Sequence, residues 1–447
     1  MADLKRDRLT VHQEKAILVG VILPGSTADP RDPLGELTAL AKTAGAKVVG
    51  TILQNRHSVD GSTYVGSGKV HEISEACIRE KANVVVFDND MSPAQIGAVE
   101  RMINKDIEAT YGVGVKVLDR SELILDIFAT RAQTHEAKLQ VELAQLEYTF
   151  PRLTKMWGHL ERINAGSGIG ARGPGEMQLE IDRRLVRKRV ADLKLDIKKI
   201  QERKTREVAE RNRQNYTVCI VGYTNAGKST LFNTLTAAGA YADDRLFATL
   251  DTKTRGWKLD RGQTVMLSDT VGFVRDLPHK LVASFKATLE EAVSADLLLH
   301  VLDVGHPHSE QQYRSVHEVL KEIGAKGKPE ILLLNKIDTE EGQEQFPVWR
   351  ALYPDAIPIS AKTGAGVATM HEAVYRYVRG QQLSVELEID MTNGKLLAFL
   401  ESQCRVENRD FIDDKVRLTV IVGKNFLREL STNEDIVILS SQSASEI

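Results

Sequence analysis

The residues with the most specific spacing form a glycine-rich loop, 222–229, that ends in Lys228 and Ser229. The loop follows the apolar run 218–221 and leads into a predicted helix, which is the context that a phosphate-binding loop requires. Glycines let successive backbone N–H groups point at a phosphate, and the start of the helix adds partial positive charge. We expect Lys228 to bridge the β- and γ-phosphates of a nucleotide and the Ser229 hydroxyl to ligate Mg²⁺. The predicted contacts are Gly222, Tyr223, Thr224, Asn225, Ala226, Gly227, Lys228, Ser229 and Thr230.

A second motif selects the base. Asp338, at the end of Asn335-Lys336-Ile337-Asp338, can accept hydrogen bonds from N1–H and the exocyclic amine of guanine. Adenine has no proton on N1, so ATP would leave this carboxylate poorly paired. The aliphatic stem of Lys336 can pack across the base. The predicted guanine contacts are Asn335, Lys336, Ile337 and Asp338, together with Ser360, Ala361 and Lys362, which supply a backbone N–H to guanine O6.

Between these motifs lies Asp269-Thr270-Val271-Gly272, which follows the apolar run 264–267. Asp269 can hold Mg²⁺ through water, and the Gly272 N–H can approach the γ-phosphate, so Lys228 and Gly272 are the predicted catalytic residues. The next residue is Phe273, where Ras-like enzymes have a glutamine that orients the attacking water. Unassisted hydrolysis should therefore be slow, with the missing group supplied by another segment or by a partner. The predicted nucleotide contacts here are Asp269, Thr270, Val271 and Gly272.

The segment 247–251 precedes that motif and offers a hydroxyl for the metal. We expect Thr249 to complete the Mg²⁺ shell with Ser229 and to order its loop when a γ-phosphate is present. Thr252 and Thr254 are weaker candidates, and a merely exposed threonine-rich loop is the alternative that spacing leaves open. The predicted nucleotide contacts in this segment are Phe247, Ala248, Thr249, Leu250 and Asp251.

Two further glycine-rich stretches imitate nucleotide motifs. Gly168, Gly170 and Gly173 match a dinucleotide fingerprint, but they lie between two predicted helices instead of after a strand. The stretch 61–70 resembles a second phosphate loop, but its lysine comes two positions late and is followed by a valine. We therefore predict that 61–70 is a connector into a helix.

The elements that position these motifs can be predicted from apolar runs. Continuous β-branched runs are typical of strands buried on both faces, and their alternation with helical spacing over 1–120 predicts a small parallel α/β domain. The three runs are 16–23, 47–53 and 83–88.

Three further segments follow. Leucine-rich stripes with spacings of three and four predict an antiparallel helical hairpin over 121–214, with a glycine-rich loop between its helices. Alternation of strand and helix resumes over 215–381, which holds every nucleotide motif, and 382–447 reads as a small α+β domain. The predicted fold class is α/β: an N-terminal parallel α/β domain with a helical hairpin, a Ras-like P-loop GTPase domain and a C-terminal α+β domain.

Charge and composition restrict the setting. The chain of 447 residues has a net charge of −3, yet 183–213 holds thirteen basic and five acidic residues. A solvated coiled-coil face is the plain alternative to a nucleic-acid surface there. The three cysteines stand far apart and no apolar run is long enough to span a membrane, so we expect a reduced cytoplasmic compartment and no structural zinc site.

With these residues in view, the chain closely resembles the HflX family of translation-factor-type GTPases over nearly its whole length. The most specific part is 168–176, with Gln178-Leu179-Glu180 and Asp182-Arg183-Arg184. The phosphate loop, 247–251 and 269–278 also match, and Phe273 fits because the family lacks the glutamine. One departure is Thr252, where the family often has a proline.

The resemblance implies a cytoplasmic, Mg²⁺-dependent GTPase that binds GTP, GDP and the large ribosomal subunit with its RNA. It implies ribosome-stimulated hydrolysis and the splitting or rescue of stalled ribosomes, and we expect a monomer. RNA phosphates would then meet the basic arm and its glycine loop, through Arg172, Arg183, Arg184, Arg187 and Lys188. Two alternatives remain open: an ATP-dependent RNA-remodelling protein with a second nucleotide site in the N-terminal domain, and a regulatory adaptor with incidental GTP binding.

Overall fold

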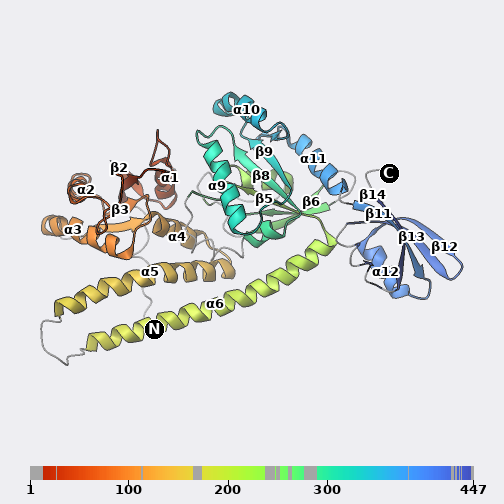
Figure 1. Ribbon diagram of the computed structural model, residues 1–447, viewed down its shortest axis with the longest axis horizontal. Helices are drawn as coiled ribbons and strands as arrows, with labels where there is room; N and C mark the ends of the chain where they lie inside the picture. Colours follow the sequence, from red (N-terminus) through yellow and green to blue (C-terminus); the bar gives the residue numbers. More distant parts are fainter. Residues whose placement is uncertain are drawn as a thin grey trace.

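Three β-sheets follow one another along the chain, and a long helical hairpin runs beside the first two (Figure 1). This architecture is seen in a computed structural model. It describes residues 14–26, 28–111, 114–164, 174–236, 247, 252–259, 264–275, 289–380, 382–423, 427, 430–431, 433 and 435–443. The predicted fold class is confirmed, with a parallel N-terminal sheet, a mixed central sheet and an antiparallel C-terminal sheet.

The N-terminal sheet has four parallel strands in the order β2-β1-β3-β4. Its core explains the unbroken apolar runs, because α1 and α4 cover one face and α2 and α3 cover the other. The strands are β1 Lys15–Ile22, β2 Lys47–Asn55, β3 Val84–Phe87 and β4 Lys116–Asp119, and the helices are α1 Gly35–Thr43, α2 Ser67–Glu80, α3 Pro93–Tyr111 and α4 Arg120–Arg131.

The glycine-rich stretch 61–70, which resembles a phosphate loop, lies in this domain. Gly66 caps the start of α2, so the stretch 61–70 is a turn and a connector into that helix, as predicted. The stretch that resembles a dinucleotide fingerprint lies between helices α5 His135–Asn164 and α6 Pro174–Gln214. Its glycines, Gly168, Gly170 and Gly173, fall outside the described residues.

Helices α5 and α6 form the predicted hairpin. Leu139 and Leu143 of α5 pack against Leu193 and Ile197 of α6, which are the positions of the leucine-rich stripes. Ion pairs also cross the hairpin: Arg189 with Glu142 at 2.8 Å, Lys194 with Glu147 at 2.7 Å and Lys204 with Glu136 at 3.0 Å. Part of the positive charge of α6 is therefore neutralised by α5.

The central sheet has the order β10-β9-β8-β5-β7-β6, in which only β6 is antiparallel to its neighbour. Each predicted nucleotide motif except 247–251 lies at the carboxyl end of a parallel strand, so the motifs meet at one edge. The strands are β5 Thr217–Gly222, β6 Lys253–Lys258, β7 Thr264–Asp269, β8 Leu297–Asp303, β9 Glu330–Asn335 and β10 Ile357–Pro358, and the helices are α7 Lys228–Thr236, α9 Ser309–Glu322, α10 Glu340–Leu352 and α11 Val367–Gly380.

The C-terminal sheet is antiparallel, in the order β12-β13-β11-β14, with α12 packed on it through Leu400. Its elements are β11 Gln382–Asp390, α12 Gly394–Gln403, β12 Arg405–Ile412, β13 Lys415–Gly423 and β14 Ile436–Ser443. Across the described parts of all three units, no helix is both long and apolar enough to cross a membrane.

Candidate nucleotide site

The phosphate loop connects β5 to α7 in the geometry that its glycines permit. Gly227 has a φ of +98°, and a Cβ there would lie 2.2 Å from Nδ2 of Asn335. A Cβ on Gly222 would lie 2.3 Å from the carbonyl oxygen of Val301 on the neighbouring strand β8. Any larger residue at either position would push the loop away from the strands that support it.

Lys228 begins α7 and is buried beneath the loop. Its Nζ donates a hydrogen bond to the carbonyl oxygen of Tyr223 at 2.7 Å, which holds the ammonium inside the curve of the loop. Burial lowers the pKa of Lys228 to about 8, although Asp269 opposes this shift. A phosphate brought into the loop would favour the charged ammonium for the same electrostatic reason as Asp269.

The donor set beside Lys228 suits a magnesium ion. The Ser229 hydroxyl donates to Oδ2 of Asp269 at 2.9 Å, and Asp269 is buried at the end of β7. A hydroxyl and a carboxylate at this spacing are the hard oxygen ligands that Mg²⁺ prefers. Thr249 lies outside the described residues, with Ala248, Leu250 and Asp251. Of the weaker candidates, Thr254 points its hydroxyl at Ser268, 2.9 Å away on the adjacent strand.

The segment after β7 lies against the phosphate loop. Phe273 pairs with the loop through its backbone: its N–H donates to the Gly222 carbonyl at 3.2 Å, and its carbonyl accepts from the Thr224 N–H at 2.7 Å. A Cβ on Gly272 would lie 2.7 Å from Cα of Thr224 and 3.0 Å from Nζ of Lys228. The Phe273 ring is buried in the core, so this residue anchors the segment and offers no polar group to a water molecule.

Phe247 belongs to the predicted metal-binding segment and makes contacts through both its backbone and its side chain. Its N–H donates to the Thr224 hydroxyl at 3.0 Å. Its ring packs edge-on against Phe128 of α4, with 4.6 Å between the ring centroids. The backbone of Phe247 therefore contacts the phosphate loop, whereas its side chain contacts the N-terminal domain.

The base-recognition motifs are joined by Asn335. Its Nδ2 donates to the carbonyl of Ala226 in the phosphate loop at 2.7 Å, and its Oδ1 accepts from the Ala361 N–H at 2.9 Å. Asp338 is exposed at the rim of the site, where its carboxylate can meet a base, and Nζ of Lys336 pairs with Asp303 at 2.7 Å. Ile337 is half-buried, Thr270 and Val271 are buried in the loop after β7, and Ser360 is buried beside the exposed Lys362.

Tyr223 belongs to the phosphate loop, and its side chain contacts the N-terminal domain. Its hydroxyl donates to Glu36 at 2.6 Å and accepts from the Arg275 N–H at 2.6 Å. Arg120 pairs with Glu36 at 2.9 Å and with Asp88 at 2.7 Å, and Arg275 pairs with Asp88 at 2.8 Å. We call these five residues the interdomain junction, because Glu36, Asp88 and Arg120 belong to the N-terminal domain.

Electrostatics shows how tightly the junction is coupled. Burial opposes the charge of Arg120, but Glu36 and Asp88 outweigh it and raise the pKa of Arg120. Burial likewise works against the Glu36 carboxylate, yet Arg120 and the Tyr223 hydroxyl lower its pKa. Burial raises the pKa of Tyr223 far above its ordinary value, and Glu36 adds to that shift. The phenol therefore stays protonated and remains a hydrogen-bond donor.

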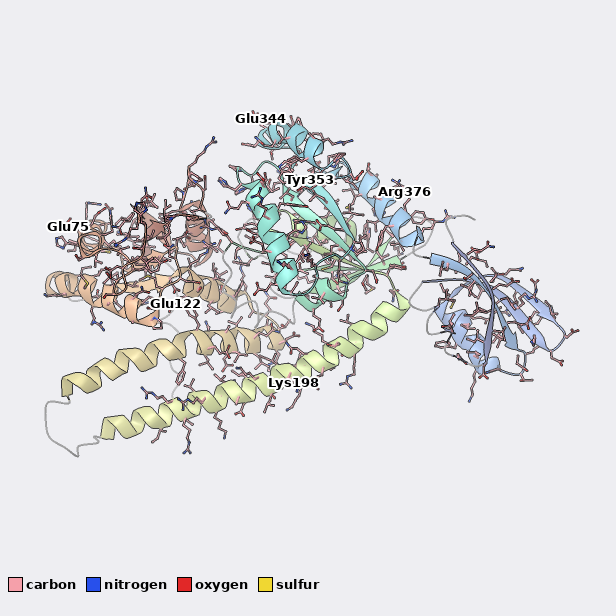
Figure 2. The ribbon with its side chains drawn as sticks, in the orientation of Figure 1. Glu75, Glu122, Lys198, Glu344, Tyr353 and Arg376 are labelled. Atoms are coloured by element: carbon pink, nitrogen blue, oxygen red, sulfur yellow. The ribbon has the colours of Figure 1, made fainter. Side chains whose placement is uncertain are left out.

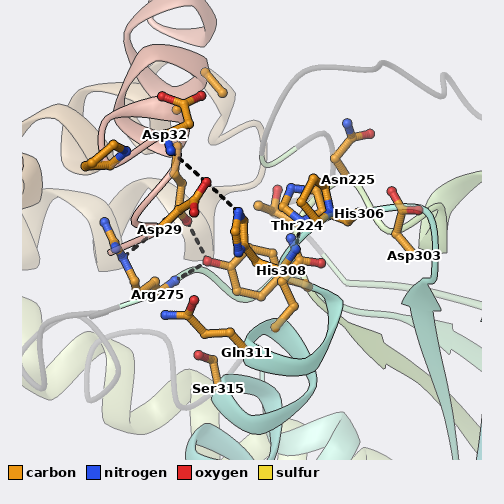
Figure 3. A pocket seen from close by; sticks show the side chains of 17 residues that line it. Asp29, Asp32, Thr224, Asn225, Arg275, Asp303, His306, His308, Gln311 and Ser315 are labelled. Carbon is orange, nitrogen blue, oxygen red and sulfur yellow. Dashed lines mark hydrogen bonds and ion pairs between the residues drawn. The ribbon is translucent and has the colours of Figure 1, made fainter. Parts of the chain in front are cut away.

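A cavity of about 340 Å³ lies beside the junction, between α1 and the phosphate loop. Figure 3 shows Thr224 and Asn225 on its GTPase side with His306 and His308, and Asp29 facing them from the N-terminal domain. His308 and Asp29 bridge the two domains at 2.6 Å. This contact surface was not predicted from the sequence, in which the one available signal was a tyrosine inside a phosphate loop.

On the arm, the basic residues predicted to meet RNA occupy the first part of α6. Arg184, Arg187 and Lys188 are exposed, and within the described residues no ion pair involves them. Arg183 is half-buried, and Arg172 lies outside the described residues. Figure 2 shows charged side chains along α6, Lys198 among them, reaching into solvent.

Comparisons with known proteins agree with this geometry. Three sequence families match consecutive parts of the chain: a GTP-binding GTPase N-terminal region over 31–129, a GTP-binding GTPase middle region over 131–213, and a 50S ribosome-binding GTPase over 217–336.

The curated relatives of this chain include several proteins named GTPase HflX. The protein of Lacrimispora saccharolytica is 39% identical over 427 residues, which cover 95% of this chain and 97% of that protein. That of Escherichia coli K12 is 42% identical over 386 residues, which cover 86% of this chain and 87% of that protein. A solved GTP-binding protein from Sulfolobus solfataricus, in complex with GDP, is 25% identical with a TM-score of 0.43, covering 81% of this chain and 98% of that one.

Removing the Asn335 side chain tests whether it holds the site together. Asn335→Ala leaves the Ala226 carbonyl and the Ala361 N–H without their partner, at a cost of about 1–3 kcal/mol for each buried group. We expect GDP affinity to fall roughly tenfold or more, measured by titration of a fluorescent GDP analogue.

Asn104→Ala is the matched control, because Asn104 makes the same two backbone bonds to Val115 in the N-terminal domain. It should lower the melting temperature as Asn335→Ala does and leave GDP affinity unchanged. Equal GDP affinities for the two variants would show that Asn335 does not organise the site.

Proposed function

Since this chain belongs to the HflX family of GTPases, we propose that it binds the large ribosomal subunit in its GTP-bound state and splits or rescues stalled ribosomes. We propose further that the ribosome stimulates its hydrolysis of GTP to GDP and phosphate. One observation carries this proposal: the position after Gly272 holds a buried phenylalanine anchored to the phosphate loop. An outside group must therefore complete the catalytic site.

In the proposed site, the loop 222–229 cradles the phosphates, and Asp338 accepts the two guanine protons. The Ser229 hydroxyl and Thr249 would hold Mg²⁺, and Asp269 would assist through a water molecule. The metal ion supplies positive charge that offsets the charge developing on the phosphate oxygens. Lys228 does the same between the β- and γ-phosphates, and the Gly272 N–H contacts the γ-phosphate.

The proposed site has no side chain at position 273 that could orient the attacking water. Hydrolysis needs a group that orients the water in line with the γ-phosphate, and the Phe273 ring has neither a donor nor an acceptor. Its burial in the core leaves it little freedom to move aside. Slow turnover in the free protein and faster turnover on the ribosome follow from this arrangement.

The arm supplies the surface for the partner. Contacts to phosphates require exposed cationic side chains. Arg184, Arg187 and Lys188 are exposed near the end of α6 that adjoins the glycine-rich loop. With Arg172 and Arg183 they would meet ribosomal RNA through its backbone and shape, since few aromatic residues on the arm could stack on bases. We also propose that the chain divides into four domains, with boundaries after residues 120, 214 and 381.

Added large subunits should raise GTP turnover by at least tenfold, because they supply the missing group. Phosphate release at saturating GTP, measured against subunit concentration, checks this. Lys228→Ala provides the background, since it removes the ammonium that the phosphates need. Turnover that does not change with subunit concentration would contradict the proposed ribosome dependence.

A charge series separates RNA contact from general electrostatics. Replacing Arg184, Arg187 and Lys188 together by Gln should weaken subunit binding and reduce its salt dependence by roughly two to three units in log–log slope. The matched control replaces Lys198, Lys199 and Arg203, which are paired within α6. Co-sedimentation at several salt concentrations measures both, and an equal loss for the two triple variants would assign the effect to net charge alone.

A further inference from the structure

Two histidines and one glutamate meet on the face of the central sheet that helix α9 covers. His300 is in the middle of β8, Glu330 is the first residue of β9, and His317 is on α9. His300 pairs with Leu332 in the parallel register, so Glu330, two residues before Leu332, is on the same face. One possible ligand atom from each of the three residues lies within 4.8 Å of the other two. The fold therefore brings three potential metal ligands together from three elements.

The nitrogens of this cluster are incompletely paired. Nδ1 of His300 lies 2.8 Å from Oε1 of Glu330, whereas Nε2 of His317 lies 3.7 Å from the same oxygen, which is too far for a hydrogen bond. Within the part of the chain that the structure describes, Nε2 of each histidine is buried and has no hydrogen-bond partner. Because buried polar atoms are rarely left unpaired, each ring has a nitrogen available to a further ligand.

The spacing of these atoms suits a small transition-metal ion. Zn²⁺ binds imidazole nitrogen at about 2.0–2.1 Å and carboxylate oxygen at about 2.0–2.2 Å, so two ligands of a tetrahedral ion lie about 3.3 Å apart. The two separations in the cluster, 2.8 and 3.7 Å, are on either side of that value. Small adjustments of the three side chains would therefore place them around one ion.

Aromatic packing holds the two imidazoles in position. Tyr313, four residues before His317 on α9, stacks on the His300 ring with 5.2 Å between the centroids and meets the His317 ring edge-on at 4.4 Å. The His300 side chain is fully buried, whereas those of His317 and Glu330 are 36% and 21% exposed. An ion could therefore enter from the solvent side of α9, and a water molecule could complete its coordination.

The cluster is separate from the nucleotide site. Glu330 and Asn335 are the two ends of β9, and five steps along a strand span about 16 Å. The Mg²⁺ donors Ser229 and Asp269 belong to the nucleotide edge, so an ion in the cluster would contact no phosphate. The cysteine spacing predicted no structural zinc site, but this cluster contains no cysteine.

We propose that His300, His317 and Glu330 form a structural Zn²⁺ site that fastens α9 to strands β8 and β9. Two imidazoles and a carboxylate favour Zn²⁺ over Mg²⁺, which prefers oxygen ligands. The unfolded chain does not hold these three side chains together, so bound Zn²⁺ stabilises the folded state. This site is independent of ribosome binding, and its occupancy should leave GDP affinity unchanged.

The test measures Zn²⁺ binding by the full-length protein saturated with Mg²⁺ and GDP. A Cys404→Ser background removes the half-exposed thiol, and the other two cysteines are buried. His317→Gln and Glu330→Gln each remove one ligand and should weaken Zn²⁺ binding by at least about 100-fold, because even the outer partners of metal ligands contribute about 10- to 100-fold. Competition with a chromophoric zinc chelator gives the dissociation constant, and Zn²⁺ should raise the melting temperature of the parent far more than that of either variant.

His71→Gln is the matched control. His71 lies 3.5 Å from Glu75 on the exposed face of α2, as a histidine–glutamate pair that belongs to no three-ligand cluster among the described residues. This variant should bind Zn²⁺ as the parent does. The inference is overturned if the chelator strips Zn²⁺ from the parent, or if His317→Gln and His71→Gln bind the ion equally well. His317→Gln decides the matter even if Glu330→Gln fails to fold, since its side chain is partly exposed.

Discussion

The contact between the carboxyl edge of the N-terminal sheet and the carboxyl ends of the parallel strands of the central sheet organises this molecule. Ligands of open α/β sheets bind at this edge, and the N-terminal domain uses its own edge to hold the GTPase domain. Asp88 follows β3, Arg120 begins α4 directly after β4, and Glu36 lies in the first turn of α1. Their partners, Tyr223 and Arg275, come from the loops after β5 and β7. Nucleotide chemistry and domain contact therefore share the same loops.

Features that depend only on residues close together in the chain could be predicted from the sequence. Strand runs buried on both faces, the stripes of the hairpin and the strand–loop–helix setting of the phosphate loop are each set within a few dozen residues. The junction could not be predicted in this way. Tyr223 lies 187 residues from Glu36, as does Arg275 from Asp88, and isolated charges in a sequence usually indicate exposed surface. Asn335 was predicted as a base contact, but its hydrogen bonds to Ala226 and Ala361 are evident only in the structure.

The arm shows a similar division. Its excess of positive charge was evident from composition, but the pairing was not. Three cations of α6 are neutralised by α5, and Arg184, Arg187 and Lys188 remain toward the loop end. At its other end, α6 contacts the GTPase domain, where the Thr205 hydroxyl donates to Glu290 at 2.8 Å. The arm thus joins the end that we propose to meet RNA to the domain that holds the nucleotide motifs.

The most direct test of the account is the distance between the two domains in each nucleotide state. Spin labels at Glu75→Cys on α2 and Glu344→Cys on α10, both exposed, would report it in a Cys404→Ser background, since the other two cysteines are buried. Pulsed electron spin resonance should give one narrow distance with GDP and a longer or broader distribution with a GTP analogue. Identical distributions at saturation with both nucleotides would contradict the claim that the nucleotide site and the interdomain junction are coupled through the loops they share.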